Sequence, residues 1–106
     1  MTVDDFKEIA AKYGIECNRG VRSTYYYYMP NSNWFMVNFY PNRHLIIRKY
    51  FIYDVRVGKI IPSDYYNKEP SYIEPKVFEE YVKEMLKNYK EACIKYKKEE
   101  VEKDFK

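Results

Sequence analysis

The chain has 106 residues, of which 46% are hydrophobic and 33% charged, and its formal net charge is +3. This length and composition predict one soluble globular domain over residues 1–106, and they exclude a disordered or fibrous protein. The longest apolar runs, such as Trp34 to Val37, are far too short to span a membrane, and the N-terminus is acidic where a signal peptide would be basic. We therefore expect a cytoplasmic protein without membrane contact.

The first predicted element is a helix over residues 3–13. Thr2 can cap its N-terminus, and Asp4 and Asp5 lie in the first turn, where the helix dipole favours acidic side chains. Apolar residues recur at helical spacing through this stretch, and Gly14 is a typical C-terminal stop.

A short loop over residues 17–22 is expected next, followed by stretches rich in aromatic and β-branched residues. The turn-forming sequences PNSN at 30–33 and PNR at 41–43 separate these stretches and predict hairpins. The third stretch is long for one strand, and its apolar alternation is interrupted at Lys49, which predicts a bulge or bend there. The predicted strands cover residues 23–29, 33–40 and 44–57, and a short edge strand is expected at 59–62.

Side-chain alternation in the second strand predicts two faces. One face would carry Phe35, Val37 and Phe39, and the other would carry Trp34, Met36 and Tyr40.

The C-terminal part of the chain predicts a long helix. An ordered connecting loop is expected over residues 62–75, and the pattern is helical from Pro75 to about residue 104. Glu79 and Lys83 are spaced to form an ion pair on the exposed side. An apolar stripe at helical spacing is formed by Phe78, Val82, Met85, Tyr89, Ala92 and Tyr96.

The predicted length of this helix suggests that its end lies outside the core. A helix of this extent is about 45 Å long, whereas a globule of this size is about 35 Å across. The last turns, from about residue 97, are therefore expected to overhang the sheet. Ile94, Val101 and Phe105 lie on a different line from the apolar stripe. We expect either that these turns fray or that the three residues contact a second copy, in a homodimer, or another partner.

The order of these elements is α-β-β-β-α, which predicts an α+β fold. We expect a small antiparallel sheet of three to four strands, packed against an N-terminal helix and a long C-terminal helix.

Charge is segregated along the chain. Residues 17–62 contain seven basic residues and one acidic residue, a surplus of +6, so the rest of the chain carries −3. All five arginines lie in this middle segment. This separation indicates an interaction surface more strongly than the modest net charge does.

Motifs of the common enzymes and metal proteins are absent from the sequence. There is one histidine, His44, and there are three glycines, too few for the glycine-rich phosphate-binding loops. Cys17 and Cys93 are far apart and form no CxxC pair, so we expect reduced thiols. The sequence predicts a protein that is not an enzyme and that has no catalytic residues, no metal and no cofactor.

The middle segment interleaves arginines with aromatic residues, including the run Tyr25 to Tyr28. These tyrosines can simply pair across strands with residues such as Phe35 and Phe39. Alternatively, they can form a positively charged aromatic platform, because arginine and aromatic side chains anchor many interfaces. The residues predicted to bind a partner are Arg22, Tyr26, Tyr28, Trp34, Tyr40, Arg43, Arg48, Tyr50 and Arg56.

Two partner classes fit such a platform. An acidic protein surface would take the arginines as bidentate anchors. Small chains without motifs and rich in A/T-coded residues resemble accessory proteins of phages and mobile elements, and this resemblance implies an inhibitor or modulator of a host protein machine that acts in the host cytoplasm. The alternative is single-stranded or structured RNA or DNA, with bases stacked on the rings and phosphates on the arginines.

Overall fold

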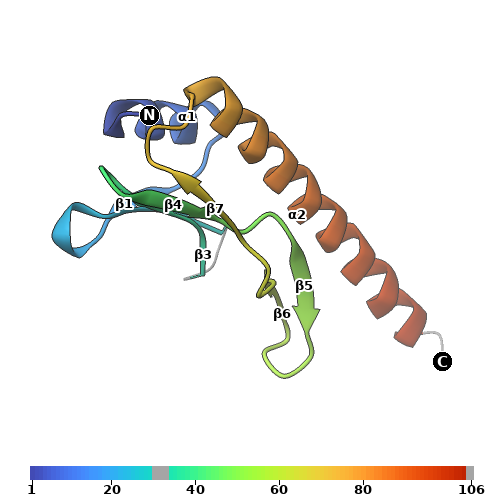
Figure 1. Cartoon of the computed structure of the whole chain (residues 1–106). Coiled ribbons are helices and arrows are strands. Elements are labelled where there is room, and N and C mark those ends of the chain that lie inside the picture. The colour runs from blue at the N-terminus through green and yellow to red at the C-terminus, as the bar shows by residue number, and fades with distance from the viewer. Residues whose placement is uncertain (30–33, 105–106) are drawn as a thin grey trace.

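The computed structural model describes residues 1–29 and 34–104, with side chains up to Tyr96 in the helix that ends at residue 104. Within these ranges the chain forms two α-helices, seven strands and a short 3-10 turn (Figure 1). The predicted α+β class, with an antiparallel sheet and a helix towards each end, is confirmed. The elements are α1 (Val3–Lys12), β1 (Cys17–Arg19), η1 (Val21–Ser23), β2 (Tyr25–Tyr28), β3 (Phe35–Tyr40), β4 (His44–Ile47), β5 (Phe51–Asp54), β6 (Lys59–Pro62), β7 (Asn67–Pro70) and α2 (Pro75–Asp104).

Helix α1 begins as its sequence predicts. The side-chain oxygen of Thr2 accepts a hydrogen bond from the backbone N–H of Asp5, and the Asp5 carboxylate accepts one from the N–H of Thr2. This reciprocal capping box satisfies N–H groups that have no partner inside the helix. The helix buries Phe6, Ile9 and Ala10.

Phe6 lies at the centre of the core. Its ring stacks on those of Tyr27 in β2 and Phe39 in β3, with ring centroids 4.1 and 4.9 Å apart. The ring of Phe78, from α2, also stacks on that of Phe6, with ring centroids 5.7 Å apart. Such stacked pairs contribute beyond the area they bury. A single aromatic cluster therefore holds both helices to β2 and β3.

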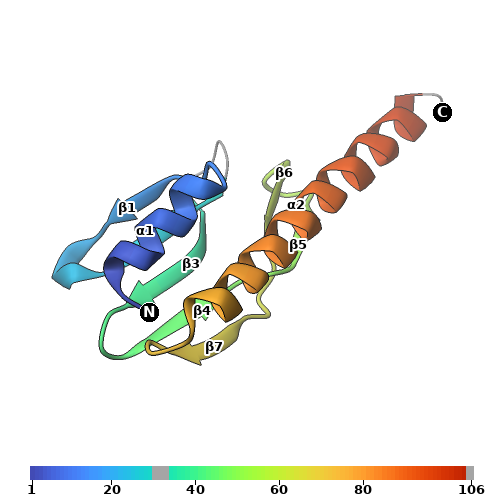
Figure 2. The same cartoon turned by 90° about the horizontal axis from the view of Figure 1, so that it is seen from above.

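Five strands form one antiparallel sheet in the order β1-β2-β3-β4-β7. Both helices lie over the same face of this sheet (Figure 2). The sheet has more strands than the three to four predicted, because β1 and β7 lie in the segments 17–22 and 62–75 that were expected to be loops. Their sequences, CNR and NKEP, have few residues with β-propensity. Backbone pairing with β2 and β4 decides their conformation instead.

The predicted single strand over residues 44–57 is divided between two sheets. β4 belongs to the five-stranded sheet, whereas β5 pairs with β6 in a separate hairpin. The chain bends between them at Lys49, where a bulge or bend was predicted. Asn88 of α2 donates a hydrogen bond to the Lys49 carbonyl at 2.9 Å, and the Lys49 ammonium lies 3.3 Å from the carboxylate of Glu84. Contacts with α2 therefore hold the bend.

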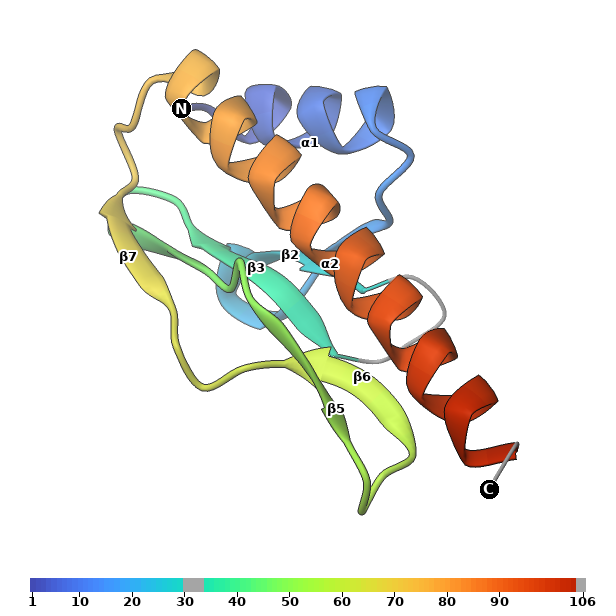
Figure 3. The ribbon, with the colours of Figure 1, turned by 90° about the vertical axis from the view of Figure 1, so that its right-hand side faces the viewer.

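The β5–β6 hairpin packs along the second half of α2 (Figure 3). Phe51 meets Tyr89 edge to face, with centroids 5.4 Å apart, and Tyr53 stacks on Tyr96 at 4.1 Å. The hairpin covers the apolar stripe of α2 as far as Tyr96, and the molecule is elongated, 52 × 26 × 22 Å. Side chains beyond residue 96 lie outside the described part, so the overhang from about residue 97 stays a prediction. Among the described residues, no helix combines the length and apolarity needed to cross a membrane.

The start of β3 departs from simple alternation. The pairing register shifts between Tyr27 and Tyr28, so that Tyr27 lies opposite Val37 and Tyr28 lies opposite Phe35. Met36 and Val37 are both buried as a result. Phe35 does not share a face with Val37 and Phe39, whereas Met36 lies in the core with them, so the predicted faces of Phe35 and Met36 are wrong. A β-bulge adds one residue to a strand and so reverses the face of every residue before it.

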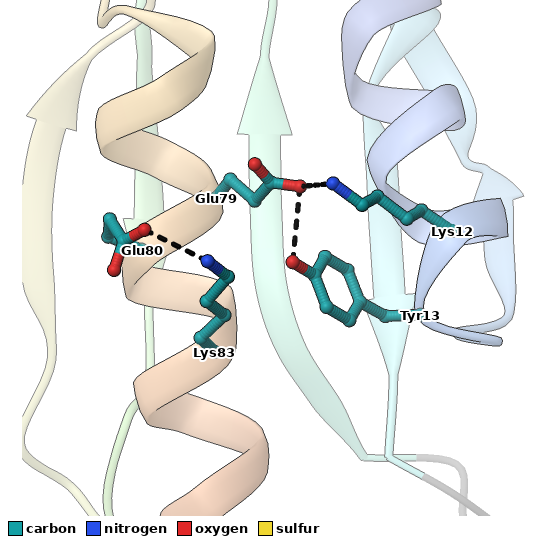
Figure 4. A network of polar contacts seen from close by, with 5 residues as sticks. All are labelled: Lys12, Tyr13, Glu79, Glu80 and Lys83. Atoms are coloured by element: carbon teal, nitrogen blue, oxygen red, sulfur yellow. Dashed lines mark hydrogen bonds and ion pairs between the residues drawn. The ribbon is translucent and has the colours of Figure 1, made fainter.

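A polar network joins the C-terminal end of α1 to the first turns of α2 (Figure 4). The Glu79 carboxylate accepts hydrogen bonds from the Lys12 ammonium, at 2.5 Å, and from the Tyr13 hydroxyl, at 3.1 Å. Lys83 pairs with Glu80 at 3.1 Å. The predicted partners Glu79 and Lys83 still interact favourably, because Lys83 contributes to lowering the pKa of Glu79. Each makes its close ion pair with another residue, since α1 supplies Lys12 to Glu79.

Candidate binding surface on the open face of the sheet

The face of the five-stranded sheet opposite the two helices is termed the open face. The pairing register places Tyr26, Asn38, Ile46 and Lys68 side by side across it. Glu69, the one acidic residue in the five strands, accepts a hydrogen bond from Tyr81 of α2 at 3.0 Å and so lies on the helix-covered face. All five strands are described, and none of them presents a carboxylate on the open face.

The four-tyrosine run is divided between the two faces, as strand alternation requires. Tyr27 is fully buried, and Tyr25 packs against the core. Tyr26 and Tyr28 face the open side, where their rings lie 4.4 and 4.8 Å from the ring of Phe35. The cross-strand packing considered from the sequence is therefore present between these two tyrosines and Phe35.

Two chain reversals enclose a cavity at one end of the open face. One reversal connects β1 to β2 and includes η1, and the other is the turn between β3 and β4. The cavity has a volume of about 640 Å³, and we call it the arginine cavity. It is lined by Val21, Arg22, Ser23, Thr24, Tyr26, Tyr40, Pro41, Asn42 and Arg43. Four of the nine residues predicted to bind a partner, Arg22, Tyr26, Tyr40 and Arg43, are thus brought together.

Gly20 allows Tyr26 to form a wall of the arginine cavity. A Cβ atom on Gly20 would lie 2.1 Å from a ring carbon of Tyr26. Only a residue without a side chain permits so close an approach of ring and backbone. The position of the Tyr26 ring therefore depends on Gly20.

A second cavity of about 340 Å³ lies at the other end of β3, between the sheet and the segment that leads from β6 to β7. We call it the Trp34 cavity. Arg48 donates a hydrogen bond to Asn38 at 3.1 Å, and its guanidinium carbon lies 5.9 Å from the Tyr66 ring centroid. The lining residues are Trp34, Phe35, Asn38, Arg48, Pro62, Ser63, Asp64 and Tyr66.

The two cavities adjoin along β3. Tyr26 lines the arginine cavity and stacks on Phe35, which lines the Trp34 cavity. At about 3.3 Å per residue, the six residues of β3 span about 20 Å. Seven of the nine predicted residues therefore lie on one surface, with the rings of Tyr26 and Tyr28 between the arginines at its two ends.

The other two predicted residues lie elsewhere. Tyr50 is in the bend between β4 and β5, where its ring lies 5.6 Å from that of Tyr65. Arg56 is in the turn of the β5–β6 hairpin and forms an ion pair with Asp54 at 3.1 Å. This hairpin projects away from the five-stranded sheet (Figure 1).

The residues predicted to contact a second copy are only partly described. Ile94 is half exposed on α2. The side chain of Val101 and the whole of Phe105 lie outside the described residues, so contact with a second copy stays a prediction.

The pKa of His44, at the start of β4, indicates the sign of the charge around this end of the open face. Its ring lies 4.8 Å from that of Tyr40. Partial burial lowers the pKa of His44, and the positive charges of Lys68 and Arg43 lower it further. This end of the open face therefore has a surplus of positive charge.

The sequence did not single out several residues of this surface. Phe35 was expected on the opposite face, and Lys68 and Tyr66 lie in a segment expected to be a loop. The sequence did not indicate a role for Asn38, because Asn38 accepts the hydrogen bond from Arg48 only when the strands of the sheet are paired. For Asn42, the PNR sequence at 41–43 indicated a position in a turn and nothing about binding.

In the described part of the chain, no cluster of three or more His, Cys, Asp or Glu residues could hold a metal ion. Both cysteines are free, and burial raises the pKa of the Cys17 thiol. Comparison with models of protein families, with curated proteins and with solved structures gives no match. Function is therefore inferred from the geometry of the chain itself.

Proposed function

We propose that the protein is a small, non-enzymatic binding protein that takes single-stranded nucleic acid on the open face of its sheet by stoichiometric contact. The observation that carries this proposal is the charge of the open face. Arg22 and Arg43 lie at one end of β3 and Arg48 lies at the other, and no strand presents a carboxylate between them. Phosphates along a strand would meet these arginines.

The aromatic residues support the same partner class. Tyr26, Tyr28 and Phe35 form a cluster of rings between the two groups of arginines. Proteins that bind single strands combine a basic track with rings on which bases stack, and each stacked base contributes about 1–3 kcal/mol. Double-stranded DNA is a poorer fit, because its bases are already stacked within the duplex.

Salt dependence tests this proposal. We would measure the binding of fluorescein-labelled single-stranded RNA and DNA oligonucleotides by fluorescence anisotropy over a range of salt concentrations. Three phosphate contacts predict a slope of log affinity against log salt of about −2. Arg48→Gln should lower the affinity and make the slope shallower by about 0.7.

Arg56→Gln is the matched control for this experiment. It removes the same charge from the β5–β6 turn, away from the open face, and should leave both affinity and slope close to those of the wild type. Equal effects of Arg48→Gln and Arg56→Gln, or no binding of any single strand by the wild type, would refute the proposal.

An acidic protein surface is the second candidate partner, and the Trp34 cavity favours it. Asp64 lines this cavity beside Arg48 and would repel a phosphate there. Trp34 and Tyr66 line this cavity, and Tyr65 precedes Tyr66 in the chain. All three side chains are exposed, and aromatic residues of this kind anchor many interfaces. On this reading the protein masks a surface of a host machine, as accessory proteins of phages and mobile elements do.

Affinity capture from a host lysate, with and without nuclease, separates the two candidates. Nucleic-acid binding predicts that nuclease removes the captured material. A protein partner captured at one fixed stoichiometry, insensitive to nuclease and lost in Arg48→Glu, would establish the second candidate instead.

A further inference from the structure

The arginine cavity brings two guanidinium groups together from separate chain reversals. Arg22 lies in η1 and Arg43 lies in the β3–β4 turn, twenty-one positions later in the sequence. Within the described part of the chain, neither guanidinium pairs with a carboxylate, and no acidic residue lines the cavity. Two arginines that line one cavity, without a carboxylate partner among the described residues, favour an anion at this end of the open face.

The other lining groups are suited to a phosphate and a planar ring. Ser23, Thr24 and Asn42 supply hydroxyl and amide groups, and Tyr26 and Tyr40 supply aromatic rings. The cavity volume of about 640 Å³ lies within the range of about 300–1,000 Å³ that is typical of small-molecule sites. Arginine binds phosphate through two parallel N–H bonds, and aromatic rings stack on bases.

The backbone of the cavity is strained at three positions. Among the described residues, the non-glycine residues with positive φ are Arg22 (58°), Ser23 (58°) and Asn42 (67°), and all three line the cavity. This left-handed conformation is unfavourable for an ordinary L-residue, although asparagine tolerates it better. Strained backbone of this kind is concentrated at binding sites, where it fixes the direction of a side chain.

We propose that the arginine cavity binds one nucleoside monophosphate unit, with the phosphate between Arg22 and Arg43 and the base against the rings of Tyr26 and Tyr40. This inference rests on the proposed binding of single-stranded nucleic acid and adds the point at which one nucleotide is held. The unit comes either from a free mononucleotide or from a strand, and both present the same phosphate and base.

Direct titration tests the inference. We would titrate the full chain with 5′-AMP, 5′-UMP, adenosine and inorganic phosphate, following backbone amide shifts by NMR. Both nucleotides should shift the amides of residues 21–24, 42 and 43 and should bind more tightly than adenosine or phosphate alone. Arg22→Gln and Arg43→Gln should each weaken 5′-AMP binding about tenfold or more. Arg56→Gln is the control and should bind 5′-AMP as the wild type does.

Gly20→Ala tests the role of the aromatic wall. The added methyl group displaces the Tyr26 ring and leaves both arginines in place, so the affinity for 5′-AMP should fall towards that for inorganic phosphate while phosphate binding is unchanged. Tyr40→Ala is a second variant with the same expectation, in case Gly20→Ala does not fold. Circular dichroism and thermal melting show whether each variant is folded.

Comparison with an oligonucleotide distinguishes the source of the unit and separates the two proposals. If strands bind and depend on Arg48 but no nucleotide binds in the arginine cavity, this inference is overturned and the proposed function stands. If neither strands nor nucleotides bind, both are overturned. Equal affinity for phosphate and 5′-AMP in the wild type also overturns the inference, because the base would then make no contact. Tighter binding of the strand than of 5′-AMP supports a unit within a strand, and the reverse supports a free nucleotide.

Discussion

Among the four consecutive tyrosines, Tyr27 has a structural role that its neighbours do not share. Its side chain is fully buried, and its hydroxyl donates a hydrogen bond to the backbone carbonyl of Phe6 in α1. Burial also raises the pKa of Tyr27, so this hydroxyl stays protonated. The bond ties β2 to the first helix within the core.

Removing this hydroxyl should therefore destabilise the protein. We expect Tyr27→Phe to lower the free energy of unfolding by about 1 kcal/mol, since a typical buried hydrogen bond contributes about that much. Tyr28→Phe, one residue later on the open face, is the control and should change it little. Urea denaturation of both variants measures the difference, and equal losses would contradict the assignment.

His44 gives a pH-dependent prediction. Its pKa lies below the usual 6.5, so the folded state favours the neutral ring and binds fewer protons than the unfolded state. Stability should therefore be unaffected above pH 6.5 and should fall as the pH decreases through the folded pKa. His44→Gln should remove this loss.

An NMR titration of the single histidine measures its pKa directly. The midpoint should lie below 6.5 in the free protein and should rise when an anion such as 5′-AMP occupies the neighbouring arginine cavity. A midpoint above 6.5 in the free protein would contradict the surplus of positive charge at this end of the open face.

Among the secondary-structure elements, α1 and α2 contact each other through Glu79. The hydrogen bond from Lys12 lowers the pKa of Glu79, and the one from Tyr13 acts in the same direction. This contact should therefore stabilise the fold above the ordinary Glu pKa of 4.5, and its contribution should be lost as the pH falls through the folded pKa.

Glu79→Gln tests the contact between the helices. We expect a small loss of stability at neutral pH, reduced by added salt, because the pair is partly exposed. The difference from the wild type should disappear in acid. Glu80→Gln is the matched control, because the partner of Glu80 among the described side chains is Lys83 on its own helix. Thermal melting of both variants over a pH series would show whether Glu79 has the larger effect.

The whole molecule is elongated because α2 extends past the five-stranded sheet and holds the β5–β6 hairpin at its far end. Ile52, Val55 and Ile94 are all exposed in this region. Exposed apolar side chains that gather into one patch mark contacts with other chains. Contact of Ile94, Val101 and Phe105 with a second copy stays a prediction.

Sedimentation equilibrium tests that prediction. We expect a concentration-dependent dimer in the wild type, and Ile94→Glu should raise the dimer dissociation constant about tenfold or more. Val77→Glu makes the same change of charge at a similarly exposed position in the first turn of α2 and should have little effect. A monomer at all concentrations would contradict a second copy as the partner of this helix.

The local chemistry of the chain was sufficient to predict some of its elements. Helix α1 and its cap, the stripe of α2, the position of the bend at Lys49 and the α+β class follow from periodicity and capping, which depend on residues close together in sequence. Arg22 and Arg43 line one cavity with Tyr26 and Tyr40, and Arg48 lines another with Tyr66, because the turns and strand lengths bring these positions to one sheet. Their contact with a partner stays a prediction.

Tertiary structure alone decided the rest. β1 and β7 form because their backbones pair with β2 and β4. The β-propensity of their own side chains does not indicate that pairing. The bulge in β3 moved Phe35 to the open face, and the connection of β5 to β6 and α2 removed Arg56 from it. These outcomes depend on hydrogen bonds and packing between segments far apart in the chain, whereas the sequence patterns report only what neighbouring residues favour.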